Sequence, residues 1–218
     1  MFCIRKPTQD QLQRFYDTQQ QLTFSYPYDV IGATREQTPP GYDPLHYRVC
    51  LGSGQAVFEA AQAALLAWRQ FPSGLAEIYP ANAALQAGTT VVVVLRALGL
   101  WKLASCRIVY TLDDCHGDES GGIQQFGFAY GTLPGHVEQG EERFAVQWNR
   151  NDNTVWYDLK SFSRPATLLV WLGMPLARYF QNRFAIQSAR AMLKAVHDQL
   201  GHANATGSAS CARQENTA

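Results

Sequence analysis

Two stretches in the first third of the chain place apolar side chains at helical spacing. The first follows Thr8 and Gln11, a pair that resembles a capping box, and predicts a helix over residues 8–22. The second follows a Gly-Ser-Gly turn and predicts a helix that ends at Pro72. Both stripes are one-sided, so each helix is expected to pack on a larger body.

A third apolar stripe, much longer, runs through the C-terminal third of the chain. Ser163 precedes Pro165, and proline loses nothing at the first helical position, so we expect the last helix to begin there. Gly173 and Pro175 predict a kink, and Gly201 is a plausible C-cap.

Between these helices the pattern changes to the alternation typical of strands. Short loops separate most of these segments, which favours an antiparallel meander. The expected strands are 45–51, 76–79, 89–95, 103–112, 124–133, 141–149 and 154–161.

This order of elements resembles the helix-grip fold of the START and Bet v 1-like proteins. The expected fold class is therefore α+β, with a curved antiparallel sheet of about six to seven strands wrapped around a long C-terminal helix. In that architecture a cavity lies between sheet and helix. An open α+β sheet is the alternative.

Length and composition indicate one domain over residues 1–200. Such a chain buries roughly 70% of its unfolded surface, enough for a sizeable core or a pocket. Residues 26–44 are rich in proline and glycine, which predicts a long irregular loop held to the body by Tyr26, Tyr28, Ile31 and Tyr42. Residues 201–218 lack large apolar side chains and are expected to be disordered.

Charge and hydropathy exclude several classes of partner. Lysine plus arginine (18) balances aspartate plus glutamate (18), so the field that draws proteins to nucleic acid is missing. No apolar run approaches the length of a membrane helix, and no export signal is visible. We expect a cytoplasmic, soluble protein with neither a nucleic-acid partner nor a membrane span.

The five cysteines show no pattern of a disulfide framework or a zinc site, which favours reduced thiols. The acidic stretch 113–119 fits neither calcium nor zinc spacing and reads as a polar hairpin tip. We therefore expect no metal and no cofactor. Common signatures of nucleophilic catalysis are also absent from the sequence.

The segment 126–144 is the most informative of the chain. Alternation places Phe126, Phe128 and Tyr130 on one face of a strand, and a hairpin would bring Tyr130 near Phe144. In the same register Glu142 would face inward near Thr132, whereas a slip of one residue would turn it outward.

An inward Glu142 would have a raised pKa and could act as a general acid or base, with Tyr130 as hydrogen-bond donor and His136 at the rim. The alternative is structural: Glu141 and Glu142 would pair with arginines or backbone amides. In that reading Arg164 clasps one of the two glutamates.

Six aromatic residues are expected to form either the core or the wall of a pocket. The candidates for ligand contact are Trp68, Phe126, Phe128, Tyr130, Phe144 and Trp148.

Several motifs together resemble a bacterial and plant family, domain-of-unknown-function family nineteen-ninety. These are Gly127 to His136, Gly140 to Phe144 and Phe162 to Pro165, with further matches between Tyr26 and Trp68. The likeness covers about residues 12–197. It adds weight to Tyr130, His136, Glu141, Glu142 and Arg164 as family-type positions, but brings no established catalytic residues.

The leading hypothesis is a protein that binds an apolar or aromatic small molecule between the sheet and the C-terminal helix. A second is a metal-independent cyclase, dehydratase or hydrolase that uses Glu142, His136 and Tyr130. A third is a protein-interaction module in which Tyr28 and Tyr42 project from the loop. The oligomeric state does not follow from the sequence.

Overall fold

The computed structural model describes residues 2–97, 99–113, 122–166, 174–203 and 214–217. Its elements, in chain order, are β1 (Phe2–Cys3), α1 (Gln9–Gln19), the 3-10 turns η1 (Tyr28–Val30) and η2 (Ala33–Arg35), β2 (Asp43–Ser53), α2 (Gln55–Leu66), β3 (Ala76–Tyr79), β4 (Thr90–Ala97), β5 (Leu100–Asp113), β6 (Ile123–Thr132), β7 (Glu138–Asn149), β8 (Thr154–Pro165), α4 (Met174–Ala203) and β9 (Gln214–Thr217).

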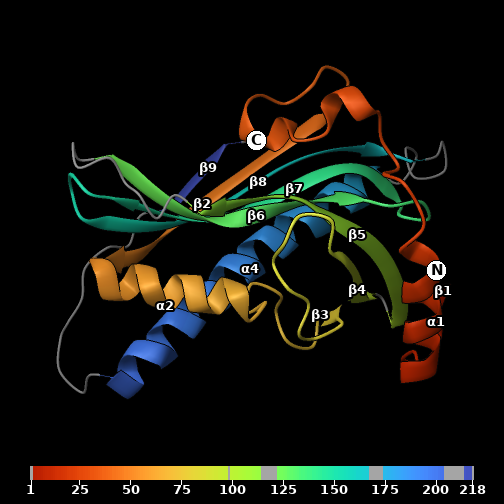
Figure 1. Cartoon of the computed structure of the whole chain (residues 1–218), viewed down its shortest axis with the longest axis horizontal. Coiled ribbons are helices and arrows are strands. Elements are labelled where there is room, and N and C mark those ends of the chain that lie inside the picture. Colours follow the sequence, from red (N-terminus) through yellow and green to blue (C-terminus); the bar gives the residue numbers. More distant parts are fainter. Residues whose placement is uncertain (1, 98, 114–121, 167–173, 204–213, 218) are drawn as a thin grey trace.

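The strands form one antiparallel sheet in the order β3-β4-β5-β6-β7-β8-β2-β9, with β1 paired to β5. The sheet is curved, and both long helices, α2 and α4, lie on one side of it (Figure 1). We call this side the inner face. The α+β prediction is confirmed; the seven strands β2 to β8 match the expected number, and the short β1 and β9 are additional.

The inner face and the two helices enclose the main core. Its largest fully buried side chains include Phe128, Phe144, Tyr157 and Met192. A buried hydrogen bond of 2.7 Å joins the Tyr157 hydroxyl on β8 to Ser188 Oγ on α4. This contact sets how the C-terminal helix is turned relative to the sheet.

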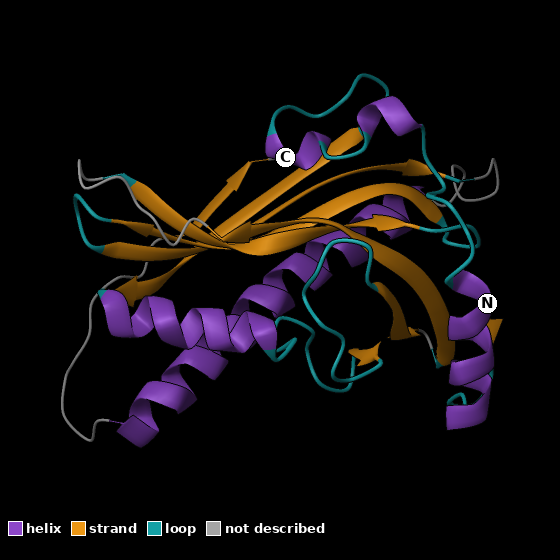
Figure 2. Ribbon diagram, in the orientation of Figure 1, coloured by secondary structure: helices purple, strands orange, loops and turns teal. Residues whose placement is uncertain are grey.

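The outer face carries α1 and the loop that follows it (Figure 2). As expected, α1 opens with a capping box, in which Gln11 N–H donates to Thr8 Oγ1 and Thr8 N–H to the Gln11 side chain. It ends at Gln19, slightly earlier than expected. Its Leu12 packs on Val92, on the outer side of β4.

Residues 24–42, which we call the strap, cross the outer face of β6, β7 and β8. Tyr26 and Tyr42 pack edge-on against Phe162 of β8 and are buried. Tyr28 is 90% exposed, so the expectation that it holds the loop to the body is wrong. It lies in η1, one of the two short turns that interrupt the irregular strap.

The C-terminal helix does not begin at Pro165. Instead β8 continues to Pro165, and Ser163 pairs with β2 on one side and β7 on the other. Proline also suits the end of a strand, where its missing N–H costs little. The first residue of α4 is Met174, so Pro175 lies in its first turn, while Gly173 is outside the described residues.

At the other end, α4 passes through Gly201 and ends at Ala203, so Gly201 is not its C-cap. Residues 214–217, expected to be disordered, form β9 beside β2. Residues 204–213 of the expected tail lie outside the described part. In the described residues, no helix is both long and apolar enough to cross a membrane.

Candidate functional site

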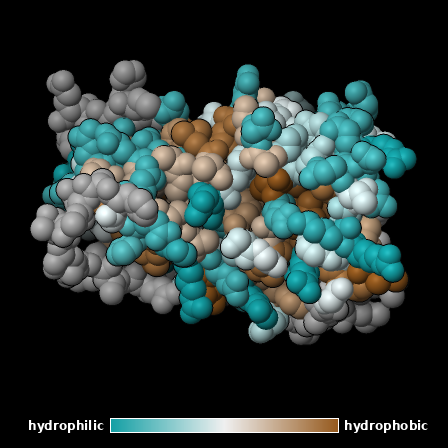
Figure 3. Space-filling model, turned by 90° about the horizontal axis from the view of Figure 1, so that it is seen from below, coloured by the Kyte–Doolittle hydropathy of each residue, from teal (hydrophilic) through white to brown (hydrophobic). Residues whose placement is uncertain are grey.

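A cavity of about 480 Å³ lies between the inner face of the sheet and α4. That volume is in the range of small-molecule sites. Apolar side chains form most of its wall: Leu45, Phe71, Val93, Leu95, Ala104, Phe180 and Phe184. On the side of the molecule that carries α2 and α4, apolar surface is interspersed among hydrophilic residues (Figure 3).

Glu142 and Tyr130 face each other across β7 and β6 within this cavity. The two residues pair directly in the sheet, and the Tyr130 hydroxyl donates a hydrogen bond of 2.7 Å to Glu142 Oε2. The inward orientation predicted by alternation is therefore found. The register differs by two residues, since Phe144 pairs with Phe128, and an even shift keeps each side chain on its face.

Burial raises the pKa of Glu142 to about 7, although the hydrogen bond from Tyr130 acts to lower it. The nearby charge of Glu138 adds to the rise. Burial also raises the pKa of Tyr130 well above its usual value, so the phenol stays a neutral donor. A carboxyl group with this pKa is present in both protonation states at neutral pH.

Polar groups on one side of the cavity connect β7 to α4. Glu138 Oε1 accepts a hydrogen bond of 2.7 Å from Gln181 Nε2, and the same amide donates to Ser163 Oγ. Burial raises the pKa of Glu138. His136 also lines the cavity. Its Nδ1 lies 2.9 Å from the Glu138 carbonyl oxygen and 3.1 Å from the Glu138 nitrogen, so it donates to the first or accepts from the second according to the tautomer.

Burial lowers the pKa of His136 to about 3, so the imidazole is neutral, with its proton on Nε2 when Nδ1 accepts. Lys102 of β5 lies in the same cavity, and burial lowers the pKa of its ammonium group. The cavity therefore combines apolar walls with a few polar groups whose ionisation is perturbed.

Glu141, the neighbour of Glu142, points to the outer face and anchors the strap. Its carboxylate accepts hydrogen bonds from the Tyr26 hydroxyl (3.1 Å), Gly32 N (2.8 Å) and Thr34 N (3.2 Å), and another from the Thr34 hydroxyl. Gly131 makes room for this contact, because a Cβ there would lie 2.1 Å from the Tyr26 oxygen. Backbone amides as partners of Glu141 agree with the structural reading.

Arg164 clasps neither glutamate, contrary to expectation. Its Nε donates to Gln139 Oε1 at 3.3 Å, and its guanidinium lies 4.8 Å from the centre of the Tyr42 ring. The reason is the register: Arg164 pairs with Gln139, whereas Glu141 pairs with Phe162. Arg164 therefore lies two residues too far along β8.

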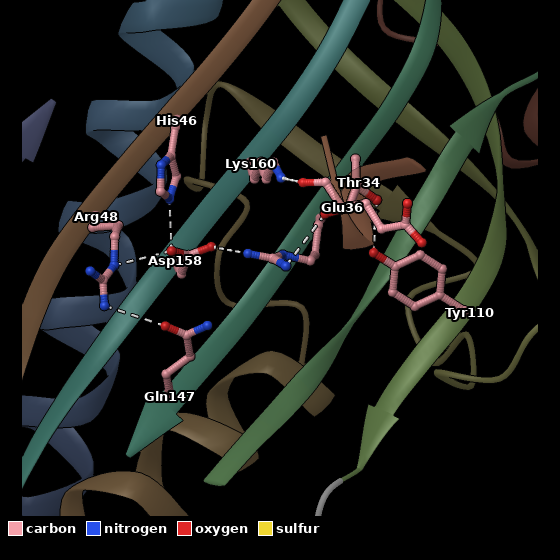
Figure 4. A network of polar contacts seen from close by, with 9 residues as sticks. Thr34, Glu36, His46, Arg48, Tyr110, Gln147, Asp158 and Lys160 are labelled. Atoms are coloured by element: carbon pink, nitrogen blue, oxygen red, sulfur yellow. Dashed lines mark hydrogen bonds and ion pairs between the residues drawn. The ribbon is translucent and has the colours of Figure 1, made fainter. Parts of the chain in front are cut away.

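A second buried carboxylate, Asp158, organises the outer face (Figure 4). It contacts His46 Nε2 at 2.8 Å, Arg48 Nε at 3.1 Å and Arg143 Nη2 at 2.5 Å. Burial alone would raise the pKa of Asp158, but His46 and Arg143 together hold it below its usual value. Arg143 of β7, which pairs with Asp158, also donates to the Thr34 carbonyl of the strap.

Of the six aromatic residues expected at a ligand, only Tyr130 lines the cavity. Phe128 and Phe144 are fully buried in the core, and Phe126 packs against it. The indole of Trp68 donates to the Ala83 carbonyl and that of Trp148 to Asn153. Trp148 packs on Phe58 of α2, and Phe128 packs on Trp68 just after α2. The strand pattern alone cannot distinguish this covered part of the inner face from the part that lines the cavity.

The sequence reasoning missed Phe71, Phe184, Lys102, Glu138 and Gln181 as cavity residues. A signal existed for Lys102, because it continues the inward series of Ala104 and Cys106 at spacing two. No such signal existed for the residues contributed by α4 and by the turn after α2.

In the described part of the chain, no group of three or more histidine, cysteine, aspartate or glutamate side chains is arranged to hold a metal ion. Among the described cysteines, Cys3 and Cys106 carry free thiols. Burial raises the pKa of Cys106, which lines the cavity, so its thiol is a poor nucleophile there.

The residues of this site fall within a stretch that matches a known family model. Residues 27–191 match the model described as domain of unknown function DUF1990. The chain belongs to the DUF1990 family. Its relatives include UPF0548 proteins of Dictyostelium discoideum (37% identity; 90% of this chain and 96% of the relative) and Deinococcus radiodurans (32%; 90% and 99%). A UPF0548 protein of Arabidopsis thaliana is 34% identical over 70% of this chain and 72% of its own length.

Two solved structures resemble this DUF1990 protein at 12% identity. One is Ara h 8.0201, with a TM-score of 0.43 over 72% of this chain and 99% of that chain. The other is a norcoclaurine synthase point mutant of Thalictrum in complex with a transition-state analogue, with a TM-score of 0.44 over 77% and 100%. Similarity at this level says nothing about what the chain binds.

Proposed function

We propose that this protein binds an apolar or aromatic small molecule in the cavity between the sheet and α4. The observation that carries the proposal is a cavity of about 480 Å³ with a mainly apolar wall and the Glu142–Tyr130 pair inside it. Apolar walls supply affinity through burial, and a few placed polar groups orient the ligand.

Ser161 offers a way to test the cavity. It lies on the inner face of β8, opposite Glu142, and lines the cavity. A Ser161→Leu variant would fill part of the space, while Ser161→Ala keeps it open. We expect Nile red to bind the wild type and the alanine variant, and binding to weaken at least about ten-fold in the leucine variant.

Native mass spectrometry of the purified protein would then identify a carried ligand. Equal dye binding by wild type and Ser161→Leu would contradict binding in this cavity. A wild type that binds no dye and carries no small molecule would contradict the proposal as a whole. The fold of each variant is checked by its circular dichroism spectrum.

The pKa of Glu142 supports a second candidate, an enzyme that moves a proton to or from the bound molecule. A carboxyl with a pKa of about 7 is both a competent acid and a competent base at neutral pH. Tyr130 holds one of its oxygens and leaves the other for a substrate. His136 lies farther along the cavity wall as a neutral imidazole.

Hydrogen exchange would distinguish this enzyme from a simple binder. Ligands recovered from the protein are incubated with it in deuterium oxide, and their mass is followed. Proton transfer at carbon predicts deuterium uptake with wild type and none with Glu142→Gln. Equal ligand affinity in Glu142→Gln and Glu141→Gln would remove Glu142 from either function.

A further inference from the structure

Two carboxyl groups face the cavity without a basic partner. Among the described residues, no lysine, arginine or histidine forms an ion pair with Glu142 or with Glu138. Glu142 has the Tyr130 hydroxyl as a partner, and Glu138 has the Gln181 amide. Both partners are neutral hydrogen-bond donors.

The outer face shows how the same sheet treats a carboxylate that keeps its charge. Asp158 is buried, and it contacts His46, Arg48 and Arg143. A buried charge is normally paired, because its removal from water is unfavourable and a neutral donor offsets only part of that loss. Glu142, by contrast, has no cation in contact with it among the described residues, and Lys102 acts on Glu138 instead.

We propose that the ligand brings this cation: a protonated amine, attached to an apolar body, donates a hydrogen bond to the Glu142 carboxylate. This inference rests on the proposed function and names the class of its ligand. The ammonium would share Glu142 with the Tyr130 hydroxyl, while the apolar body would lie against Phe71 and Phe184.

The titratable groups near Glu142 do not already neutralise its negative charge. Lys102 acts electrostatically to lower the pKa of Glu138, whereas burial, the Tyr130 hydrogen bond and the charge of Glu138 shift the pKa of Glu142. Cys106 and Tyr157 sense the charge of Glu142, but both have raised pKa values and stay neutral. From α4, Arg183 is exposed at the margin of the cavity.

Three probes of similar size separate charge from apolar burial: 4-phenylbutylamine, 4-phenylbutanol and 4-phenylbutyrate. Each is titrated against Nile red bound to the full chain at about pH 8, where Glu142 is ionised and the amine still protonated. We expect the amine to displace the dye at a concentration about ten-fold or more below that of the alcohol. The butyrate is expected to be the weakest.

Glu142→Gln is expected to remove the preference for the amine and to keep the affinity for the alcohol. The matched control is Glu59→Gln, which deletes one negative charge from the exposed side of α2 and should leave the preference unchanged. A second measurement is proton release: amine binding at about pH 7 should expel protons, because the cation stabilises ionised Glu142.

The outcomes separate the two proposals. Equal displacement by amine and alcohol, or stronger displacement by the butyrate, overturns the amine and leaves the cavity as a binding site. An amine preference that survives in Glu142→Gln also overturns it. Failure of the dye and of all three probes to bind the wild type overturns the proposed function together with the amine.

Discussion

Glu141 and Glu142 are consecutive residues of β7 with the same side chain and opposite surroundings. Glu141 faces outward and accepts hydrogen bonds from three residues of the strap. Glu142 faces inward, and its hydrogen-bond partner is the single phenol of Tyr130. The hydrogen bonds of the Glu141 carboxylate are made by groups of the protein itself. The Glu142 carboxylate can accept a further hydrogen bond from a molecule that enters the cavity.

This difference teaches how one strand can serve stability and function at once. On the outer face, Glu141 and Asp158 each hold several donors, so their ionised forms are built into the fold. On the inner face, burial raises the pKa of Glu142, so its ionised form is not stabilised by the fold. Perturbed groups of this kind are characteristic of functional sites.

The sharpest way to break the comparison is to make the same substitution at both positions. Glu141→Gln replaces an acceptor for several buried donors with an amide that can satisfy only some of them. We expect it to lower the free energy of unfolding by about 3 kcal/mol or more. Glu142→Gln should not lower it near pH 7 and should raise it by about 1 to 3 kcal/mol, because the neutral amide removes the cost of ionising a buried carboxyl group.

Urea denaturation of the three proteins measures both values. Similar losses for the two variants would mean that Glu142 is as structural as Glu141, and the contrast between the faces would not hold.

A second substitution tests the contact between Tyr26 and Glu141 that anchors the strap. The Cβ of Gly131→Ala would lie 2.1 Å from the Tyr26 oxygen, so Tyr26 must leave Glu141. We expect a loss of roughly 2 to 4 kcal/mol in the free energy of unfolding, from crowding and from the lost hydrogen bond. Tyr26→Phe in the same background is the control.

In that background Tyr26→Phe should cost much less than it does in the wild type, because the hydrogen bond is already broken. Additive effects of the two substitutions in denaturation experiments would contradict a contact between Gly131 and Tyr26 as the cause.

A third test sharpens the comparison through pH. The folded-state pKa of Glu142, about 7, lies above the ordinary value of 4.5 expected in the unfolded chain. Between these values the folded protein keeps a proton that the unfolded chain releases, so this group makes stability fall as pH rises. We expect a loss of about 1 to 3 kcal/mol from pH 4.5 to pH 7.

Glu142→Gln should remove this part of the pH dependence. Thermal unfolding of both proteins across that pH range, with the difference between them plotted, isolates the contribution. A difference that does not change with pH would show that Glu142 titrates normally.

The smallest effect is expected at Tyr28, which lies in the strap but touches the body little. Its side chain is 90% exposed, in contrast to the buried Tyr26 and Tyr42. Tyr28→Ala should change the free energy of unfolding by less than about 0.5 kcal/mol. A clear loss in urea denaturation would mean that the strap depends on more than its two buried tyrosines.

The sequence pattern predicts much of this molecule because alternation and helical spacing are local. It places Glu142 inward with Tyr130, and it finds the capping box of α1. The predicted register of the hairpin differs from the observed one by two residues. Alternation specifies which face of the sheet a side chain occupies more strongly than it specifies which residue it pairs with on the next strand.

The partners of Glu141 could not be predicted, because they come from a loop more than 100 residues earlier in the chain. Arg164 was assigned to the wrong partner for a related reason: two residues of register separate it from Glu141. The start of the last helix was misplaced because Ser163 and Pro165 fit the end of a strand equally well. Which aromatic residues line the cavity depends on where α2 lies, a tertiary fact.

The hydrogen bond between Tyr157 and Ser188 has a consequence for ligands of different size. Ser188 lies in α4, C-terminal to Phe180, Gln181 and Phe184, which cover the cavity. Beyond it, α4 packs against α2. The C-terminal half of α4 is therefore held in place. We expect a larger ligand to be admitted by a tilt of the N-terminal half of α4 about Ser188.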